Sequence, residues 1–320
     1  MRKRLINFQY NKFKMVLIVN LNTTIDKTHI VNDYKIDRVY RPVKTIKVGG
    51  GKGINVARVL NKLKIPYNVI GFLGGVNRRF VIRNFKKEKI NFVEIPIKGD
   101  SRDITIVVDP INRTETVINE KGPVISPQEQ KLFLKKFERL IKKVKYLAIC
   151  GSMPLGMPYT FYGKLIEIAK KYGVFTLLDT SNRPLFESIK FGPDLIKPNE
   201  TEFKIICHKR FPNIKKEISE LYKKGIKYII LTKGRKGCIG FDGKKFIKVK
   251  PPKITKISTV GSGDAFTAGL IYSFIKGKNF ADSLVFATAC AAANALKIGA
   301  GELNLKDIYK LLPEIKSSVF

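Results

Sequence analysis

The sequence is poor in the residues that build metal centres and disulfide frameworks. It has only two histidines and four cysteines, and no two cysteines form a CxxC pair. Zinc sites need closely spaced Cys and His, and small secreted domains need paired cysteines, so both classes are disfavoured. We therefore expect a protein of a reducing cytoplasm. The cysteines stand far apart in the chain, as Cys150, Cys207, Cys238 and Cys290.

Long hydrophobic runs and a signal peptide are also missing. No apolar run reaches the roughly 20 residues that cross a bilayer, so no membrane association is expected. Residues 1–14 are basic but lack the apolar segment of a secretory signal. Met15 directly precedes the first strand-like run, at 16–19. We expect residues 1–14 to be a disordered extension or a mis-assigned start, and residues 15–320 to form the folded domain.

Acidic residues are scarce. Lys and Arg number 61 against 26 Asp and Glu, which gives a formal charge of +35. Such a charge is one signature of nucleic-acid or membrane-surface binding. Here the basic residues are spread along the whole chain, and spread charge reads a nucleic-acid groove poorly. We favour a compositional bias and expect no specific nucleic-acid partner, although the charge should attract polyanionic substrates.

One stretch has the features of a phosphate-handling loop. Residues 258–266 read STVGSGDAF and lead into an apolar run with helical spacing. Asp264 would then lie in the first turn of a helix, after a small-residue loop of Gly261, Ser262 and Gly263. The free N–H groups of a helix N-terminus hold anions. A carboxylate beside them suits phosphoryl transfer; a glycine-rich turn with an Asp near its cap is the alternative.

A second glycine-rich segment, GGGKGINVARVL, occupies residues 49–60. Its glycines allow close backbone approach, and the apolar residues after them have helical spacing. Lys52 and Asn55 fall at the start of that helix, where they can hold a phosphate and a hydroxyl. The segment satisfies neither the P-loop pattern GxxxxGK[ST] nor the dinucleotide fingerprint GxGxxG.

Three further positions carry polar groups at suitable places. Asp26 follows the first expected strand and can bind a polyol, although a lone Asp in a loop is more often a turn former. Asn199 and Glu202 stand three apart before a helix, which favours a capping box over an Mg²⁺ site. Arg102 heads an expected hairpin and can cover a substrate anion, with a solvated strand face as the alternative.

From Ser126 onward strands and helices alternate, which predicts a parallel sheet covered by helices. Segments 28–48 and 91–118 instead alternate in polarity, which predicts a small separate sheet. The expected helices are 127–144, 158–172, 214–224 and 280–296, and the expected strands are 146–150, 174–178, 195–196 and 228–231, followed by a hairpin of 238–241 and 246–249.

Taken together, these segments resemble the PfkB (ribokinase-like) carbohydrate kinases, and within them the hexose-phosphate branch of 1-phosphofructokinase and tagatose-6-phosphate kinase. The resemblance covers residues 15–316. GGGKGINVARVL and STVGSGDAFTAG look like the two signatures of the family. Further matches occur in the right order: LNTTIDKT, GFLGG, TETVINEKGP, GSMPLGMP, DTSNRPL and KPNETEF.

The resemblance implies a three-layer α/β/α sandwich with a mostly parallel central sheet and a small antiparallel β lid, expected at about 28–48 and 91–118. In the family the lid closes over the sugar and often forms a dimer contact, so a homodimer through the lid is expected. Closure would exclude water and limit wasteful hydrolysis of ATP.

The resemblance also implies roles, position by position. Asp264 matches the catalytic base, and Gly261, Ser262 and Gly263 match the anion hole. Asn199 and Glu202 match the NxxE that serves Mg²⁺ and the nucleotide phosphates. The nucleotide-side TxGxxG is matched by Thr232, Gly234 and Gly237. The sugar side is matched by Asp26, Gly50, Gly51, Lys52 and Asn55, with Lys52 and Arg102 as candidates for the phosphate already on the sugar.

Two departures affect the sugar contacts. Thr23 replaces the usual proline of the first motif, and Ser101-Arg-Asp-Ile104 lacks the last Asn of Thr-Arg-x-Asn. The expected reaction is ATP- and Mg²⁺-dependent phosphorylation of a ketohexose phosphate: fructose 1-phosphate first, then tagatose 6-phosphate, then fructose 6-phosphate. A ribokinase or nucleoside kinase is the second expectation. A non-catalytic nucleic-acid binder is the third, and the intact Asp264 argues against it.

Overall fold

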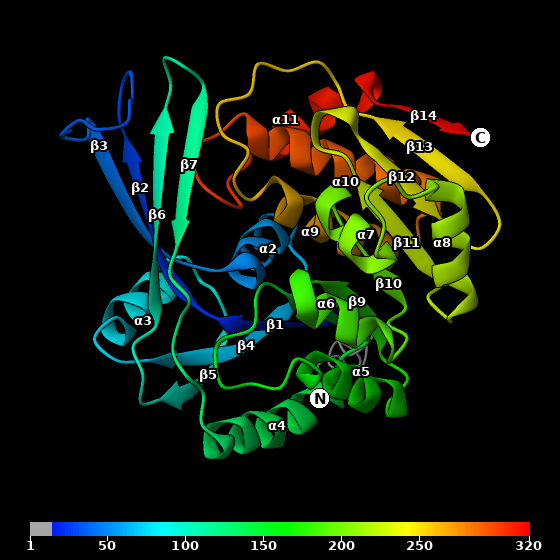
Figure 1. Ribbon diagram of the computed structural model, residues 1–320, viewed down its shortest axis with the longest axis horizontal. Coiled ribbons are helices and arrows are strands. Elements are labelled where there is room, and N and C mark those ends of the chain that lie inside the picture. The colour runs from blue at the N-terminus through cyan, green and yellow to red at the C-terminus, as the bar shows by residue number, and fades with distance from the viewer. Residues whose placement is uncertain (1–14) are drawn as a thin grey trace, which may run out of the picture.

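The computed structural model describes residues 15–320, so the expectation for residues 1–14 lies outside the described residues. Seven neighbouring strands of its central sheet pair parallel, and the three strands at one edge pair antiparallel (Figure 1). The order across the sheet is β14 (Lys316–Val319), β13 (Phe246–Lys250), β12 (Cys238–Phe241), β11 (Tyr228–Thr232), β10 (Leu195–Ile196), β9 (Phe175–Asp179), β8 (Tyr146–Cys150), β1 (Val16–Asn22), β4 (Tyr67–Gly74) and β5 (Phe92–Ile97).

Helices cover both faces of this sheet and form two separate cores. Because both faces are covered, the interior strand β1 is buried along its whole length and begins with a continuous apolar run. One face carries α2 (Lys52–Lys62), α3 (Arg78–Lys87), α9 (Ser262–Ile275), α10 (Phe280–Ala295) and α11 (Leu305–Leu311). The other carries α4 (Pro127–Ile141), α5 (Phe161–Lys171), α6 (Asn182–Ile189), α7 (Glu200–Cys207) and α8 (Ile214–Lys223). The expected three-layer sandwich is confirmed.

Helix α9, which carries the predicted phosphate-handling loop, is held tightly in its layer. It packs against α10, and a Cβ on Gly269 would lie only 2.7 Å from the Cα of Ala287. Both helices are apolar on nearly every side, as expected of helices buried between a sheet and their neighbours. The first turn of α9 therefore has a fixed position relative to the sheet.

A second sheet of four strands stands away from the central one, and we call it the lid (Figure 1). Two of its pairings are antiparallel, whereas β2 and β6 pair parallel. Only Thr23 separates β1 from β2, so the chain passes directly from one sheet into the other. The order of the lid strands is β3 (Lys44–Gly50), β2 (Thr24–Ile30), β6 (Arg102–Asp109) and β7 (Thr114–Asn119).

The structure corrects two expectations about the lid. β5 was expected in it, but pairs parallel with β4 at the edge of the central sheet and buries Ile95 and Ile97 in the core. An edge strand has the same polar alternation as a lid strand, so the pattern did not separate them. Asp26 was expected in a loop, but lies on β2, which begins earlier than predicted.

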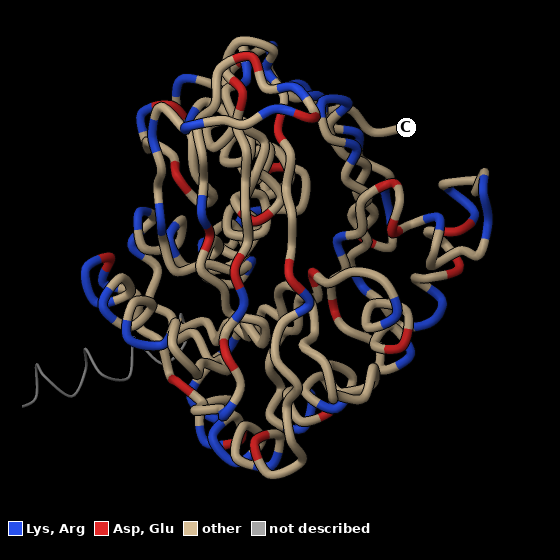
Figure 2. Tube along the Cα trace, turned by 60° about the vertical axis from the view of Figure 1, so that its left-hand side comes forward, with Lys and Arg blue, Asp and Glu red and all other residues tan. Residues whose placement is uncertain are grey.

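The distribution of charge and the state of the cysteines agree with what the sequence predicted. Figure 2 shows Lys and Arg distributed over all parts of the trace, with Asp and Glu among them. All four cysteines carry free thiols. Within residues 15–320, no helix is both long and apolar enough to cross a membrane.

Candidate active site

A cavity of about 540 Å³ lies between the lid and the edge of the central sheet where β1, β8, β9 and β10 end. The N-termini of α2, α7 and α9 meet at the same place. Ligands bind at this edge of open α/β sheets because the strand ends leave a crevice there. Most of the predicted site residues line the cavity: Asp26, Gly51, Lys52, Asn55, Arg102, Asn199, Glu202, Thr232, Gly261, Gly263 and Asp264.

Four predicted site residues do not line it. A Cβ on Gly50 would lie 2.2 Å from the Asp26 carboxylate, so this glycine makes room for Asp26. Gly234 and Gly237 belong to the turn after β11, where a Cβ on Gly237 would lie 1.9 Å from the Val249 carbonyl oxygen. Their observed role is to shape that turn. The amide of Ser262 donates to the Thr259 carbonyl oxygen at 3.1 Å.

Asp264 lies in the first turn of α9 with its carboxylate buried. Its Oδ2 accepts a hydrogen bond from Asn55 Nδ2 at 2.8 Å. Burial raises the pKa of Asp264 to about 6, and the nearby negative charge of Asp179 acts in the same direction. The positive charge of Lys52 opposes this rise. The group is thus ionised at neutral pH yet basic enough to take a proton.

The backbone around Asp264 offers free donors. Gly261 has φ 79°, and a Cβ there would lie 2.6 Å from the Ala300 Cα, so only glycine fits this turn. Within the described part of the chain, the amides of Gly263 and Asp264 have no backbone acceptor. The Lys197 ammonium lies 3.8 Å from the point where a Cβ on Gly263 would stand. Amides, helix dipole and ammonium therefore converge on one anion-binding position.

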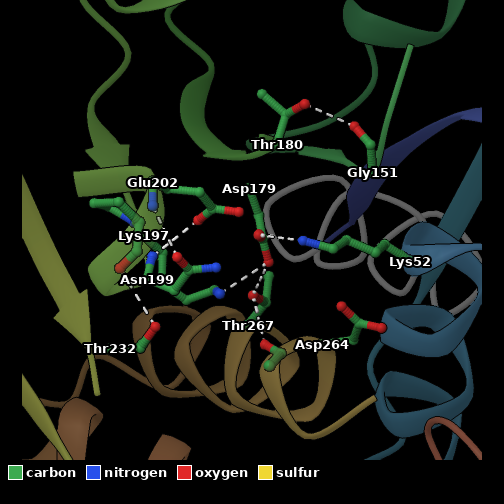
Figure 3. A network of polar contacts seen from close by, with 12 residues as sticks. Lys52, Gly151, Asp179, Thr180, Lys197, Asn199, Glu202, Thr232, Asp264 and Thr267 are labelled. Atoms are coloured by element: carbon green, nitrogen blue, oxygen red, sulfur yellow. Dashed lines mark hydrogen bonds and ion pairs between the residues drawn. The ribbon is translucent and has the colours of Figure 1, made fainter. Parts of the chain in front are cut away.

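Asp179, which the sequence reasoning missed as a site residue, is the centre of a buried charge network at the end of β9 (Figure 3). Its Oδ1 is 3.2 Å from Lys52 Nζ, and its Oδ2 is 3.2 Å from Lys197 Nζ and 2.7 Å from Thr267 Oγ1. Burial by itself would raise the pKa of Asp179. The two ammonium groups and the hydroxyl outweigh burial and hold it at about 2.

Lys52 lies against this network. The Asp179 carboxylate raises its pKa, so the ammonium stays charged. Its side chain remains 40% exposed toward the cavity, and its charge lowers the pKa of Asp264. The ammonium is therefore close to the predicted base as well as to Asp179.

Asn199 and Glu202 form the predicted capping box at the start of α7. Glu202 N–H donates to Asn199 Oδ1 at 2.9 Å, and Asn199 N–H donates to Glu202 Oε2 at 2.8 Å. Figure 3 shows the other carboxylate oxygen of Glu202 directed toward Asp179. Residues 15–320 contain no group of three His, Cys, Asp or Glu that could hold a metal. Mg²⁺ needs only one or two carboxylates beside water and substrate phosphates, so Glu202 fits such an ion.

The lid side of the cavity carries polar groups without protein partners. Among the described residues, Arg102 Nε and Asn22 Oδ1 are buried and make no hydrogen bond. The remaining guanidinium nitrogens of Arg102 donate to the Glu120 carbonyl oxygen at 2.7 Å and to Ser152 Oγ at 3.4 Å. Asn22 Nδ2 also donates to Ser152 Oγ, at 3.1 Å. Both residues line the cavity, so a ligand bound there would lie beside them.

Asp26 lies beside them on β2, buried against the cavity. Burial raises its pKa, whereas the Thr24 hydroxyl, which donates to its Oδ1, and the charge of Arg102 lower it. Asn22, Ser152, Asp179 and Lys197 were not predicted as site residues. Two sequence signals could have found them: each lies at or just after the C-terminal end of a strand, and each falls within a segment that resembles the family.

A family model described as "pfkB family carbohydrate kinase" matches residues 20–307. A solved structure from Thermotoga maritima, described as a "Possible 1-phosphofructokinase", is 26% identical with a TM-score of 0.85, covering 96% of this chain and 99% of that chain. Phosphofructokinase-2 from Escherichia coli in complex with fructose-6-phosphate is 21% identical with a TM-score of 0.84 and coverage of 93% and 98%. Its tetrameric inhibited form is 22% identical with a TM-score of 0.83 and the same coverage.

Proposed function

The chain belongs to the pfkB family of carbohydrate kinases, as its motifs predicted, and we propose that this ATP-dependent sugar kinase phosphorylates a ketohexose phosphate, with fructose 1-phosphate as substrate and fructose 1,6-bisphosphate as product. One observation carries the proposal: the buried carboxylate of Asp264 and the guanidinium of Arg102 belong to residues that line a single cavity. The first suits a base, and the second suits an anion on the sugar. The similarity to the Thermotoga maritima protein supports the choice of fructose 1-phosphate.

On the nucleotide side, we propose that the γ-phosphate of ATP lies at the N-terminus of α9. The free amides of Gly263 and Asp264 and the Lys197 ammonium would hold its oxygens. Glu202 would hold Mg²⁺ through one carboxylate oxygen, and Asn199 would fix that carboxylate by capping α7. The ion would neutralise charge on the nucleotide phosphates. Thr232 lines the same end of the cavity and would border the nucleotide.

On the sugar side, Asp26 and Asn55 would bind hydroxyls, and Gly51 would let the sugar approach the backbone. Arg102, with Asn22 and Ser152 beside it, would bind the phosphate already on the sugar through its guanidinium. Lys52 would instead act at the transferring phosphoryl group, because its ammonium lies against Asp179 and lowers the pKa of Asp264.

The reaction follows from this arrangement. A sugar hydroxyl oxygen attacks the γ-phosphorus in line, and its proton passes to Asp264. The bond from the γ-phosphorus to the oxygen that bridges to the β-phosphate breaks, and ADP leaves. Asp264 is ionised at neutral pH because its pKa is about 6, so it can accept the proton. Preorganised donors at the helix N-terminus would stabilise the charge that develops on the phosphoryl oxygens.

A homodimer through the lid accompanies this proposal. The lid and its connecting segment expose large apolar side chains, including Val39 at 99%, Ile36 at 83% and Ile118 at 61%. Exposed apolar clusters often mark an interface. Sedimentation velocity should show a dimer that Val39→Lys dissociates, and a monomeric wild-type protein at micromolar concentration would contradict it.

ADP release with Mg-ATP tests the function against fructose 1-phosphate, tagatose 6-phosphate, fructose 6-phosphate, fructose, ribose and adenosine. Fructose 1-phosphate should give the highest turnover, and Asp264→Asn should lower kcat by about three orders of magnitude or more if Asp264 is the base. Turnover on ribose or adenosine alone would keep the family and overturn the role of Arg102. A folded protein that turns over none of the six would overturn the proposed substrate class.

A further inference from the structure

We propose that Arg58 is a positioning residue for the reaction. Held by Glu88, it fixes the side-chain amide of Asn55 in the one orientation that donates a hydrogen bond to Asp264. The proposal deepens the proposed function and rests on Asp264 being the base. It assigns a task to two residues, Arg58 and Glu88, neither of which lines the cavity.

Every nitrogen of the Arg58 guanidinium is engaged. The side chain is 5% exposed. Nε donates to Glu88 Oε2 at 2.7 Å, and NH2 donates to Glu88 Oε1 at 3.2 Å, so the ion pair is bidentate. NH2 also donates to the Gly49 carbonyl oxygen at 2.5 Å, and NH1 donates to Asn55 Oδ1 at 2.9 Å. Arg58 thus joins the end of α3, the glycine turn before α2, and Asn55.

The chemistry of the guanidinium sets the direction of the next hydrogen bond. An arginine side chain only donates, so the atom of Asn55 that faces Arg58 must be the carbonyl oxygen. The NH₂ group of Asn55 must then face Asp264, at 2.8 Å from Oδ2. A flipped amide would place its oxygen against the Asp264 carboxylate and its NH₂ against the guanidinium. Both contacts would be repulsive.

The surroundings keep this chain of contacts rigid. Asn55 and Arg58 are three residues apart on α2, so they share one helix face. A Cβ on Gly301 would lie 2.7 Å from the backbone oxygen of Asn55, and a Cβ on Gly261 would lie 2.6 Å from the Ala300 Cα. The 300–301 segment therefore packs between α2 and the turn at Gly261.

The charged groups around Asp264 and Arg58 determine how the loss of the Arg58–Asn55 hydrogen bond would change the pKa of Asp264. Lys52 from α2, Asp179 from β9 and Lys197 after β10 face Asp264, whereas α10 packs on α9 with uncharged residues apart from Asp282 in its first turn. Asp26, Glu88 and Tyr67 face Arg58. Among the described side chains, Asn55 alone hydrogen-bonds the Asp264 carboxylate.

Without Arg58, the Asn55 amide is free to turn its oxygen toward Asp264, where it stabilises the protonated acid by accepting its O–H. The proton would then be held more tightly, and the acid limb of the pH–rate profile would move upward. The rate would recover once the pH exceeds the new limb, because the base is ionised again. A merely structural defect would instead lower the rate at every pH.

The test compares pH profiles of kcat for the wild type and Arg58→Met, with the same sugar phosphate and saturating Mg-ATP. The acid limb should move up by about one pH unit, with kcat lowered about tenfold below the limb and close to the wild type well above it. The KM for ATP should not change. An acid limb that stays in place in a folded Arg58→Met protein overturns the proposal.

Glu88→Ala covers the case in which Arg58→Met fails to fold, since it removes both carboxylate acceptors that hold Arg58 and frees the guanidinium to turn away from Asn55 Oδ1. A smaller upward shift is expected, and no shift in Glu88→Ala overturns the proposal. Glu94→Ala is the matched control, because Glu94 forms a similar bidentate pair with Arg78 outside the cavity. Asp264→Asn distinguishes a failure of this proposal from a failure of the proposed function. If the variant keeps its activity, Asp264 is not the base, and the proposed function itself is overturned.

Discussion

The two sides of the cavity are built differently. On the central-sheet side, Asp179, Lys197 and Asp264 are all nearly fully buried, and Asp179 meets three partners. On the lid side, β7 is almost entirely exposed and the outer half of β3 is exposed as well. The groups that we propose for phosphoryl transfer thus lie on the part that buries its charges. Two of the groups that we propose for sugar recognition, Asp26 and Arg102, lie on strands of the more exposed lid.

The largest expected effect tests how far the sheet side depends on its buried charges. Asp179→Asn leaves Lys52 and Lys197 without their anion and should destabilise the fold by about 3–5 kcal/mol. It should also move the acid limb of kcat downward, because the charge of Asp179 raises the pKa of Asp264. Urea unfolding followed by circular dichroism measures the first effect, since the chain has no Trp.

Asp194→Asn is the matched control for this variant. Asp194 is also buried and bonded to Thr176 and Lys227, but it lies at the opposite end of the same strands. It should cost stability without moving the acid limb. Equal limb shifts in both variants would contradict a local effect of Asp179 on the base.

A second effect concerns the stability of the fold, which is lowered at neutral pH by the raised pKa of Asp264. Its pKa rises from the usual 3.8 to about 6, so the folded state binds more protons between these values and loses stability as pH rises through them. Asp264→Asn should therefore flatten this slope between about pH 4 and 6 and stabilise the fold at pH 7 by up to about 3 kcal/mol.

Asp179 has the opposite sign, because its pKa falls to about 2. Its contribution is present above its usual value of 3.8 and is lost as pH falls toward 2. Unfolding free energies measured from pH 3 to 8 for the wild type and Asp264→Asn would separate the two groups. An unchanged slope between pH 4 and 6 would mean that Asp264 is not the group that titrates there.

On the lid side, Arg102→Gln should raise the KM for the sugar phosphate about ten- to a hundredfold, because one charge-assisted contact to a phosphate is lost. The KM for ATP should change little. Arg113→Gln is the control, since Arg113 is an exposed arginine at the far turn of the same hairpin. A rise in both Michaelis constants would show that Arg102 does not act on the sugar side alone.

Sequence patterns predicted the sheet side of the fold better than the lid. The alternation after Ser126 is a local signal and was confirmed. The helix expected after the small-residue loop was also found, but it begins inside that loop, at Ser262. The first strand was predicted to end at residue 19, but β1 continues to Asn22. Asn20 and Asn22 are polar yet buried, because Asn20 Oδ1 accepts from Gly53 N–H at 3.0 Å and Asn22 faces the cavity.

The pairings within the site could not be predicted from local patterns. Lys52 and Asp179 are 127 residues apart, and Asn55 and Asp264 are 209 apart. Which lysine meets which carboxylate depends on how the strand ends converge. A glycine count likewise does not separate Gly261, which borders the cavity, from Gly237, which makes room for the Val249 carbonyl.

The smallest expected effect concerns the contact that joins the two sides. Glu115 on β7 accepts hydrogen bonds from the Ser258 hydroxyl, from Thr259 N–H at 2.8 Å and from Thr259 Oγ1 at 2.9 Å, directly before the turn at Gly261. A glutamine there would turn an NH₂ group toward one of these donors. Glu115→Gln should therefore weaken lid closure and raise the KM for the sugar phosphate about two- to fivefold, with kcat little changed.

Glu120→Gln tests whether the effect depends on that bridge. Glu120 lies just after β7, and among residues 15–320 its carboxylate accepts a hydrogen bond only from Asp103 N–H of the lid, at 2.8 Å. If both variants change KM equally, the lid as a whole is sensitive and the bridge has no special role. If only Glu115→Gln changes it, the exposed lid takes its closed position from the same segment that holds the transferred phosphate. Binding on the two sides would then be coupled, because a phosphate that orders residues 258–263 would, through Glu115, also hold the lid over the sugar.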